Sequence, residues 1–79
     1  MRYRVLRQAS FDSAAQRIFH APAHPGLTGV EWVLERNPQQ GRKASARVWI
    51  IKFLLAPVYF TIYYTIDDAK HIVHLIDLK

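Results

Sequence analysis

Apolar and polar positions alternate with a period of two at the start of the chain, and the period then changes to that of a helix. Residues 2–8, RYRVLRQ, place apolar side chains between or beside arginines, which predicts a first strand with one basic face that ends before Ser10. From Phe11 onward the apolar residues follow the i, i+3, i+4, i+7, i+8 spacing of a helical stripe. We expect a first helix here that stops near His20. Its stripe consists of Phe11, Ala14, Ala15, Ile18 and Phe19.

A second helix is predicted between a proline-containing bend and a proline-marked end. The bend is residues 20–26, HAPAHPG, where each proline removes a backbone donor and disfavours helical geometry in the residue before it. We expect the helix to begin near Thr28 and to end at Asn37 and Pro38, with Gly41 supplying the turn. The two helices would form a hairpin. The predicted apolar face of the second helix is Leu27, Val30, Val33 and Leu34, and the residues expected to face water are Glu31, Glu35 and Arg36.

The most apolar stretch, residues 48–66, is predicted to form two strands and not a membrane span. It contains Lys52 and Pro57, and a central lysine costs roughly 2.5–3.5 kcal/mol on membrane-insertion scales. Its β-branched and aromatic residues also suit a sheet. We expect antiparallel strands at residues 47–55 and 59–67. On the second strand the core face should be Phe60, Ile62, Tyr64 and Ile66, and the other face Tyr59, Thr61, Tyr63 and Thr65.

An acidic turn at residues 67–70, DDAK, and a closing strand at residues 71–78, HIVHLIDL, complete the pattern. The expected order is strand, helix, helix, strand, strand, strand, or β-α-α-β-β-β. This order predicts an α+β fold, in which the helical hairpin packs against a small, largely antiparallel sheet. A chain of 79 residues has room for one small domain, residues 1–79, of marginal stability.

The absence of cysteine, the first residues of the chain and the net charge each change the picture. The chain has no cysteine, which excludes disulfides and thiolate metal sites and favours a reducing cytoplasm. The first eleven residues lack the continuous apolar stretch of a signal peptide, so secretion is not expected. Eleven Lys and Arg against six Asp and Glu give a formal net charge of +5. Such an excess favours a polyanionic partner, whether nucleic acid, an acidic protein segment or lipid headgroups, and the alternative is a charge that only keeps the protein soluble.

Metal and cofactor sites are not expected. His20 and His24 have helical spacing but prolines intervene, and His71 and His74 should point to opposite faces of a strand. No cysteine or acidic cluster completes a ligand set, and the three glycines do not form a phosphate-binding loop. The paired aspartates are explained by the turn that they form. We therefore expect neither a metal nor a cofactor.

The basic residues are the remaining candidates for chemistry. Cations beside aromatic side chains such as Trp49 or Tyr63 are what phosphate neutralisation and base stacking require. A solvated basic face and a core role for most of the aromatics are the alternative. The candidates for binding nucleic acid or another target are Arg42, Lys43, Arg47, Lys52 and Lys79, with Arg2, Arg4 and Arg7 on the first strand.

The order and spacing of these pieces resemble the RelE/ParE superfamily of bacterial toxins from type II toxin–antitoxin systems. The resemblance is carried by LERNPQQG at residues 34–41, the basic loop at 42–47 and the hairpin FTIYYTIDDAKHIVHLIDL at 60–78. The family pattern has a helix end of the form L-x-x-N/D-P-x-x-G, a strand like Y-R-(apolar)-x-Y-x-(apolar), an acidic turn and a closing apolar strand. The resemblance covers nearly the whole chain.

The resemblance implies a toxin held inactive by a cognate antitoxin, whose helix or strand covers an apolar groove. ParE-like members poison DNA gyrase, whereas RelE-like members cleave mRNA on the ribosome with arginines and lysines and no metal. One of those arginines lies in the Y-R motif, where this chain has Phe60 and Thr61. A threonine donates one hydrogen bond but cannot neutralise the charge that develops on a scissile phosphate. The family's other basic and tyrosine groups would begin beyond Lys79, and Lys52 is the candidate match for a catalytic lysine.

The expected function is therefore that of a ParE-like or other non-nuclease toxin that acts in the cytoplasm on a protein target. The first alternative is a RelE-like, metal-independent endoribonuclease. The others are an inactive family member that still binds its antitoxin, and a basic nucleic-acid-binding module outside any toxin system.

Overall fold

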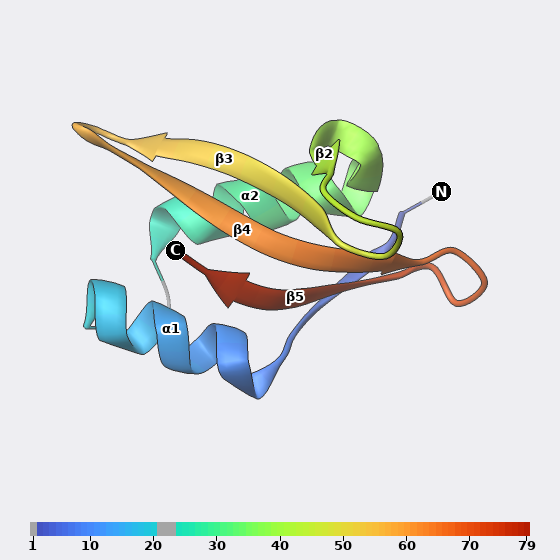
Figure 1. Ribbon diagram of the computed structural model, residues 1–79, viewed down its shortest axis with the longest axis horizontal. Coiled ribbons are helices and arrows are strands. Elements are labelled where there is room, and N and C mark those ends of the chain that lie inside the picture. The colour runs from blue at the N-terminus through green and yellow to red at the C-terminus, as the bar shows by residue number, and fades with distance from the viewer. Residues whose placement is uncertain (1, 21–23) are drawn as a thin grey trace.

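The computed structural model describes residues 2–20 and 24–79, which form a five-stranded sheet and two α-helices (Figure 1). The strand order across the sheet is β1-β5-β4-β3-β2, with β1 parallel to β5 and the other neighbours antiparallel. The α+β class is therefore confirmed. The elements are β1 (Arg4–Arg7), α1 (Ala9–Phe19), α2 (Pro25–Arg36), a 3-10 helix η1 (Pro38–Gln40), β2 (Arg42–Lys43), β3 (Trp49–Leu55), β4 (Val58–Asp67) and β5 (Ile72–Leu78).

The prediction of a plain loop at residues 42–47 was wrong, because the chain forms an additional short strand there. Arg42 and Lys43 pair with Ile50 and Trp49 of β3, so the observed order is β-α-α-β-β-β-β. Strand pairing uses backbone groups and tolerates charged side chains at the edge of a sheet. Polarity alone therefore does not separate such an edge strand from a loop.

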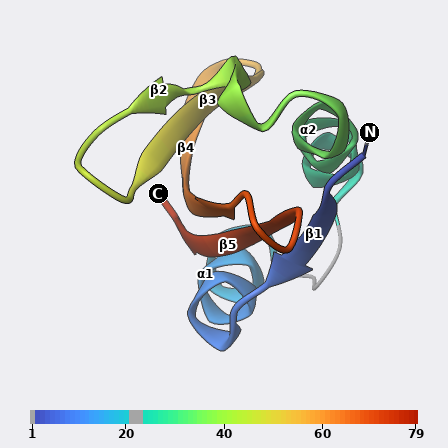
Figure 2. The same cartoon turned by 90° about the vertical axis from the view of Figure 1, so that its right-hand side faces the viewer.

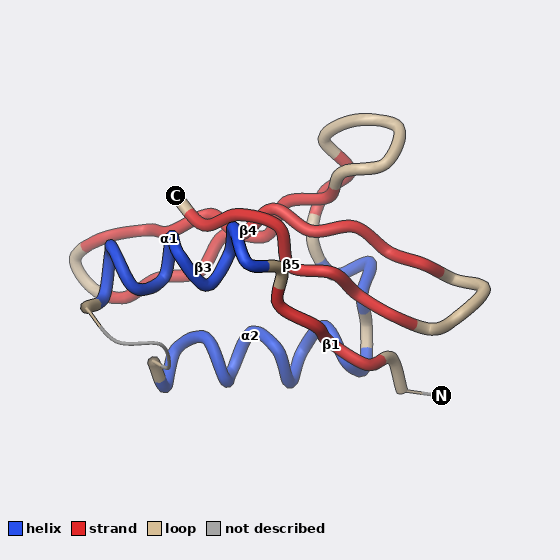
Figure 3. The backbone as a smooth tube through the Cα atoms, turned by 90° about the horizontal axis from the view of Figure 1, so that it is seen from below, coloured by secondary structure: helices blue, strands red, loops and turns tan. Residues whose placement is uncertain are grey.

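His20 and His24 mark the end of α1 and the start of α2. His20 ends α1 with a left-handed φ of 57°, and its N–H donates to the carbonyl of Gln16 at 2.9 Å. The predicted start of α2 near Thr28 was three residues late. Helix α2 begins at Pro25, because proline is favoured at the first helical position and the His24 Nδ1 accepts from the Gly26 N–H at 3.0 Å. Pro22 lies outside the described residues, and Figure 3 shows α1 and α2 with roughly antiparallel axes.

Both helices bury their apolar stripes against the same face of the sheet. Helix α1 packs along β5, and α2 contacts both β1 and β3 where the sheet curls (Figure 2). The rings of Phe19 and Phe60 lie 5.2 Å apart, which joins the end of α1 to β4. The expectation that Glu31 faces water was wrong, since its carboxylate pairs with Arg7 of β1 at 2.6 Å. The buried core is Phe11, Ala14, Ala15, Leu27, Val30, Leu34, Ile62, Tyr64, Val73, Leu75 and Leu78.

The predicted hairpin of two long strands is confirmed, with β3 and β4 joined at residues 56–57. The predicted division of β4 into faces is also confirmed at its centre, where Ile62 and Tyr64 are fully buried while Tyr59 on the other face is 68% exposed. The acidic turn follows β4 as expected, and Asp67 Oδ1 accepts from the Lys70 N–H at 3.1 Å. None of the helices in the described residues has the length and apolar character needed to cross a membrane.

Candidate functional site

A row of basic side chains crosses the sheet on the face opposite the helices. Lys52 of β3 is the cross-strand partner of Thr61 on β4. Thr61 in turn exchanges two backbone hydrogen bonds with Lys79, at 2.8 and 2.9 Å. Directly paired residues point to the same side of a sheet, so the three side chains lie in the order lysine, threonine, lysine. Figure 1 shows the end of the chain beside β4, as this pairing requires.

A second row on the same face adds an arginine and an aromatic ring. Arg42 pairs with Ile50, and Ile50 pairs with Tyr63, whose ring centroid lies 5.3 Å from the Lys79 ammonium. Arg42 and Lys52 also line one open cleft of about 480 Å³. The residues that make up this basic face are Arg42, Lys52, Thr61, Tyr63 and Lys79.

The five predicted binding residues do not form one cluster. Arg42, Lys52 and Lys79 share the basic face, whereas Lys43 and Arg47 line a separate cavity with Trp49. The separation follows from strand geometry, because adjacent residues such as Arg42 and Lys43 point to opposite faces. A sequence-based grouping of the whole basic segment was therefore too coarse.

The basic face can attract anionic groups, but its centre is neutral. Three exposed cations would raise the local concentration of a polyanionic partner and speed its association. Thr61, half-buried between the two lysines, offers one hydroxyl for a hydrogen bond. Asp77, the β5 partner of Tyr63, adds one carboxylate, whose Oδ1 accepts from the Leu78 N–H at 2.8 Å. Among residues 2–20 and 24–79 no group of His, Asp and Glu is placed to hold a metal ion.

Comparison of the chain with protein-family models, curated proteins and solved structures found no match. The evidence for its function is therefore the chemistry of the surfaces themselves.

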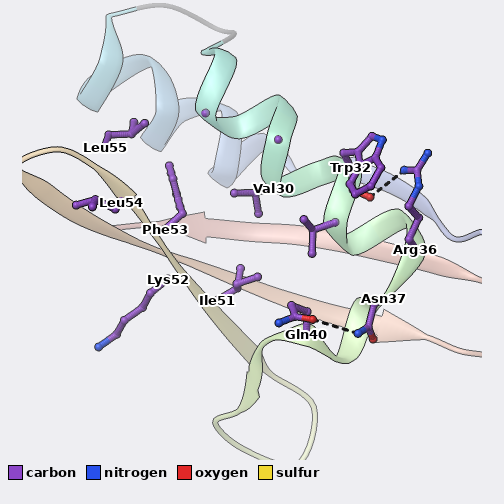
Figure 4. Close-up of a pocket in the computed structure, with 13 residues that line it drawn as sticks. Val30, Trp32, Arg36, Asn37, Gln40, Ile51, Lys52, Phe53, Leu54 and Leu55 are labelled. Carbon is purple, nitrogen blue, oxygen red and sulfur yellow. Dashed lines mark hydrogen bonds between the residues drawn. The ribbon is translucent and has the colours of Figure 1, made fainter.

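An apolar groove runs between α2 and β3, and the sequence pattern did not locate it. It has a volume of about 600 Å³, and its walls include Val30 and Val33 of α2 and Phe53 of β3 (Figure 4). Trp32 lies beside it, 57% exposed, with the Arg36 guanidinium 3.8 Å from its ring centroid. Lys52 also borders the groove, but its side chain points away from α2. Gly26 and Gly29 line the groove on the α2 side: a Cβ added at Gly29 would meet nothing within 4 Å, whereas one added at Gly26 would collide with the Leu55 side chain.

The outer edge of β3 beside this groove offers unpaired backbone groups. Thr61 directs its N–H and C=O to Lys79, so its neighbours Phe60 and Ile62 direct theirs to β3. Their partners on β3 are Phe53 and Ile51. The residues that alternate with these partners, Lys52 and Leu54, therefore direct their backbone N–H and C=O groups away from β4. Among the described residues, β2 is the strand that pairs with this edge of β3, and it covers only Trp49 and Ile50. Within that part of the chain the stretch from Lys52 to Leu54 is consequently an open edge, and Leu54 is 51% exposed.

Buried Tyr64 holds β2 and η1 in place behind the basic face. Its hydroxyl donates to the Pro38 carbonyl at 2.8 Å and accepts from the Gly41 N–H at 3.2 Å. Burial raises the pKa of the Tyr64 hydroxyl, and the Gly41 hydrogen bond offsets part of that effect. A side chain at Gly41 would collide with the Ile50 carbonyl and the Tyr64 hydroxyl, which explains why glycine stands there. This interaction fixes the start of β2 and hence the position of Arg42.

Proposed function

We propose that the protein is a RelE/ParE-like toxin that inhibits bacterial growth by binding a macromolecular target, with DNA gyrase the expected one, and does so without cutting RNA. The observation that carries this proposal is Thr61, which lies between Lys52 and Lys79 at the centre of the basic face. The α+β class of the fold is in line with the proposal, and the observed order has one strand, β2, more than the expected β-α-α-β-β-β. The proposed site of action is the cytoplasm.

The chemistry of phosphoryl transfer explains why Thr61 argues against a nuclease. A guanidinium holds two phosphate oxygens at once and keeps its charge, so it stabilises the charge that develops during cleavage. A threonine hydroxyl carries no charge. Lys52 and Lys79 supply long-range attraction, which serves association with an anionic surface equally well.

The groove between α2 and β3 suits the antitoxin that this proposal requires. An extended segment could pair with the open backbone of Lys52–Leu54 and place alternate apolar side chains against Phe53 and Val30. The net charge of +5 favours an acidic segment. A small adjacent reading frame with a DNA-binding first half and an acidic or amphipathic second half would encode such a partner, and its co-expression should restore growth.

A RelE-like ribosome-dependent endoribonuclease is the second candidate. The gathering of Arg42, Lys52 and Lys79 around Tyr63 favours it, because metal-independent cleavage of RNA needs several cations and a proton-transfer group on one face. On this alternative Lys52 stabilises charge on the scissile phosphate.

Induced expression in bacteria separates the two candidates. Cells are pulse-labelled for new protein and new DNA after induction. Gyrase-linked DNA breaks with an SOS response support the proposed function, whereas prompt arrest of translation with cut mRNA supports the nuclease. Normal growth would overturn both and leave an inactive relative or a basic nucleic-acid-binding module.

The role of the basic face is tested by Lys52→Ala against a matched control. Lys70→Ala removes the same charge from the exposed turn after β4. We expect cells that express Lys52→Ala to need about tenfold more inducer for the same growth inhibition. This factor corresponds to the loss of one charge-assisted contact of about 1.4 kcal/mol. Lys70→Ala should behave like the unmodified chain. Equal effects of the two variants would show that only net charge matters and that the basic face is placed wrongly.

A further inference from the structure

A second, more enclosed cavity lies where the β2–β3 hairpin meets the end of β4. It has a volume of about 490 Å³ and does not include the residues of the basic face. Its walls combine an indole ring, two cations and several hydrogen-bonding groups. The side chains that matter are Lys43, Arg47, Trp49, Gln39, Thr65 and Asp68.

The two cationic side chains project from a hairpin whose backbone is hydrogen-bonded. Lys43 is the cross-strand partner of Trp49, so its side chain projects on the same side as the indole. The loop that carries Arg47 is closed by bonds from the Ala44 N–H to the Val48 carbonyl at 2.8 Å and from the Val48 N–H to Ser45 Oγ at 3.3 Å. Both cations are therefore presented from ordered backbone at the wall of the cavity.

The indole of Trp49 is also held in place. It stacks with Tyr64, with ring centroids 6.4 Å apart and an interplanar angle of 26°. Tyr64 is fully buried and bonded through its hydroxyl to Pro38 and Gly41. An aromatic ring fixed in this way loses little conformational entropy when a ligand stacks on it.

The remaining polar groups add a carboxylate and two neutral hydrogen-bonding side chains to the wall of the cavity. Asp68 accepts a hydrogen bond from the Tyr3 hydroxyl at 2.7 Å, which orients its carboxylate and raises the pKa of Tyr3. A carboxylate repels phosphate but accepts hydrogen bonds from the amino group of a base. Gln39 and Thr65 can donate or accept hydrogen bonds.

We propose that this cavity binds a nucleotide unit, with the base stacked on Trp49, the phosphate held by Lys43 and Arg47, and the amino edge of the base turned to Asp68. An aromatic surface beside cations is the combination that binds single nucleotide units with little sequence preference. The carboxylate favours adenine, guanine or cytosine over uracil, which has no amino group. This site is independent of the toxin proposal, because it uses neither the basic face nor the groove.

The test uses Trp49 as its own reporter. In a Trp32→Phe background Trp49 is the sole tryptophan, and the Phe ring still accepts the Arg36 guanidinium. Fluorescence is titrated with AMP, CMP, UMP, inorganic phosphate and a short single-stranded oligoadenylate. We expect saturable quenching by AMP and CMP, weaker quenching by UMP and none by inorganic phosphate.

Charge-matched variants place the binding site. Arg47→Gln should weaken AMP binding by about tenfold, whereas Arg17→Gln, which removes the same charge from exposed α1, should leave it unchanged. Tighter binding of the oligoadenylate than of AMP would show that the ligand is a nucleotide within a single-stranded nucleic acid. Equal binding of the two would show that the ligand is a free nucleotide. The proposal is overturned if AMP gives no saturable quenching, if phosphate alone quenches equally, or if Arg17→Gln weakens binding as much as Arg47→Gln.

Discussion

The two faces of the β3–β4 hairpin share one backbone but differ in role: the inner face packs in the core, and the outer face is a candidate binding surface. The inner face carries Ile62 and Tyr64, which are fully buried under the helices, and the outer face carries Lys52 and Thr61, where the structure describes no covering helix. A step of one residue along β4 thus moves from a core position to a candidate binding position. Because side chains alternate along a strand, stability and recognition can be varied almost independently in one element.

The largest expected difference between the faces comes from removing inner apolar volume. Ile62→Ala should lower the free energy of unfolding by about 2–5 kcal/mol, since a fully buried aliphatic side chain leaves both lost contacts and a cavity. Urea unfolding followed by far-UV circular dichroism measures the loss. If the variant does not fold, Ile62→Val should show about 0.5–1.5 kcal/mol. A loss below about 0.5 kcal/mol in Ile62→Ala would mean that the core is not packed as described.

A smaller and pH-dependent effect is expected at Tyr64. Tyr64→Phe leaves the Pro38 carbonyl and Gly41 N–H without their buried partner, which should cost about 1–3 kcal/mol near neutral pH. The raised pKa of Tyr64 means that the folded state holds its proton more tightly than the unfolded chain. The protonated Tyr64 hydroxyl therefore adds to the free energy of unfolding below about pH 10, and this addition is lost as the pH rises through the pKa of Tyr64 in the folded state.

The free energy of unfolding of Tyr64→Phe and of the unmodified chain, measured from pH 8 to pH 11, therefore tests this role of the inner face. The deficit of Tyr64→Phe should narrow above about pH 10, because the unmodified chain loses stability there. Tyr59→Phe, on the exposed outer face, serves as the control and should match the unmodified chain near neutral pH. A deficit for Tyr64→Phe that widens with alkaline pH would contradict the assigned direction of the shift.

The smallest expected change is at the centre of the outer face. Thr61→Val keeps the β-branched shape and the backbone pairing with Lys79, so the free energy of unfolding should change by less than about 0.5 kcal/mol. Denaturant unfolding of Thr61→Val and of Ile62→Ala compares the free energies of unfolding at two neighbouring residues that lie on opposite faces. A loss above about 1 kcal/mol would show that the Thr61 hydroxyl supports the fold, and the distinction between the two faces would then fail at this position.

Periodicity was sufficient to predict the elements that bury a regular face. The stripe from Phe11 to Phe19 and the β3–β4 hairpin were both recognisable because repeated apolar positions leave a strong signal. The start of α2 was misplaced because a proline can begin a helix as well as end one, and His24 supplies the cap that decides between them. Strand β2 had no such signal, since its two residues are exposed cations.

The candidate sites depended more heavily on register. The sequence marked Lys52 and Lys79 as candidates, but only strand pairing places them on either side of Thr61. Lys43 and Arg47 were marked together with them, and the same pairing assigns these two to the cavity beside Trp49. The groove between α2 and β3 involves segments about twenty residues apart, and no local pattern shows that these segments pack side by side.

The sequence alone determined the α+β class, the two amphipathic helices and the inner face of β4, because these depend on the spacing of apolar residues along a short stretch of chain. Only the tertiary structure decided which cations are neighbours, where β3 keeps an open edge and which cavity holds an aromatic ring. Those properties arise when distant segments are brought into register by backbone hydrogen bonds, and such bonds are made by groups that every residue shares except for the N–H missing in proline.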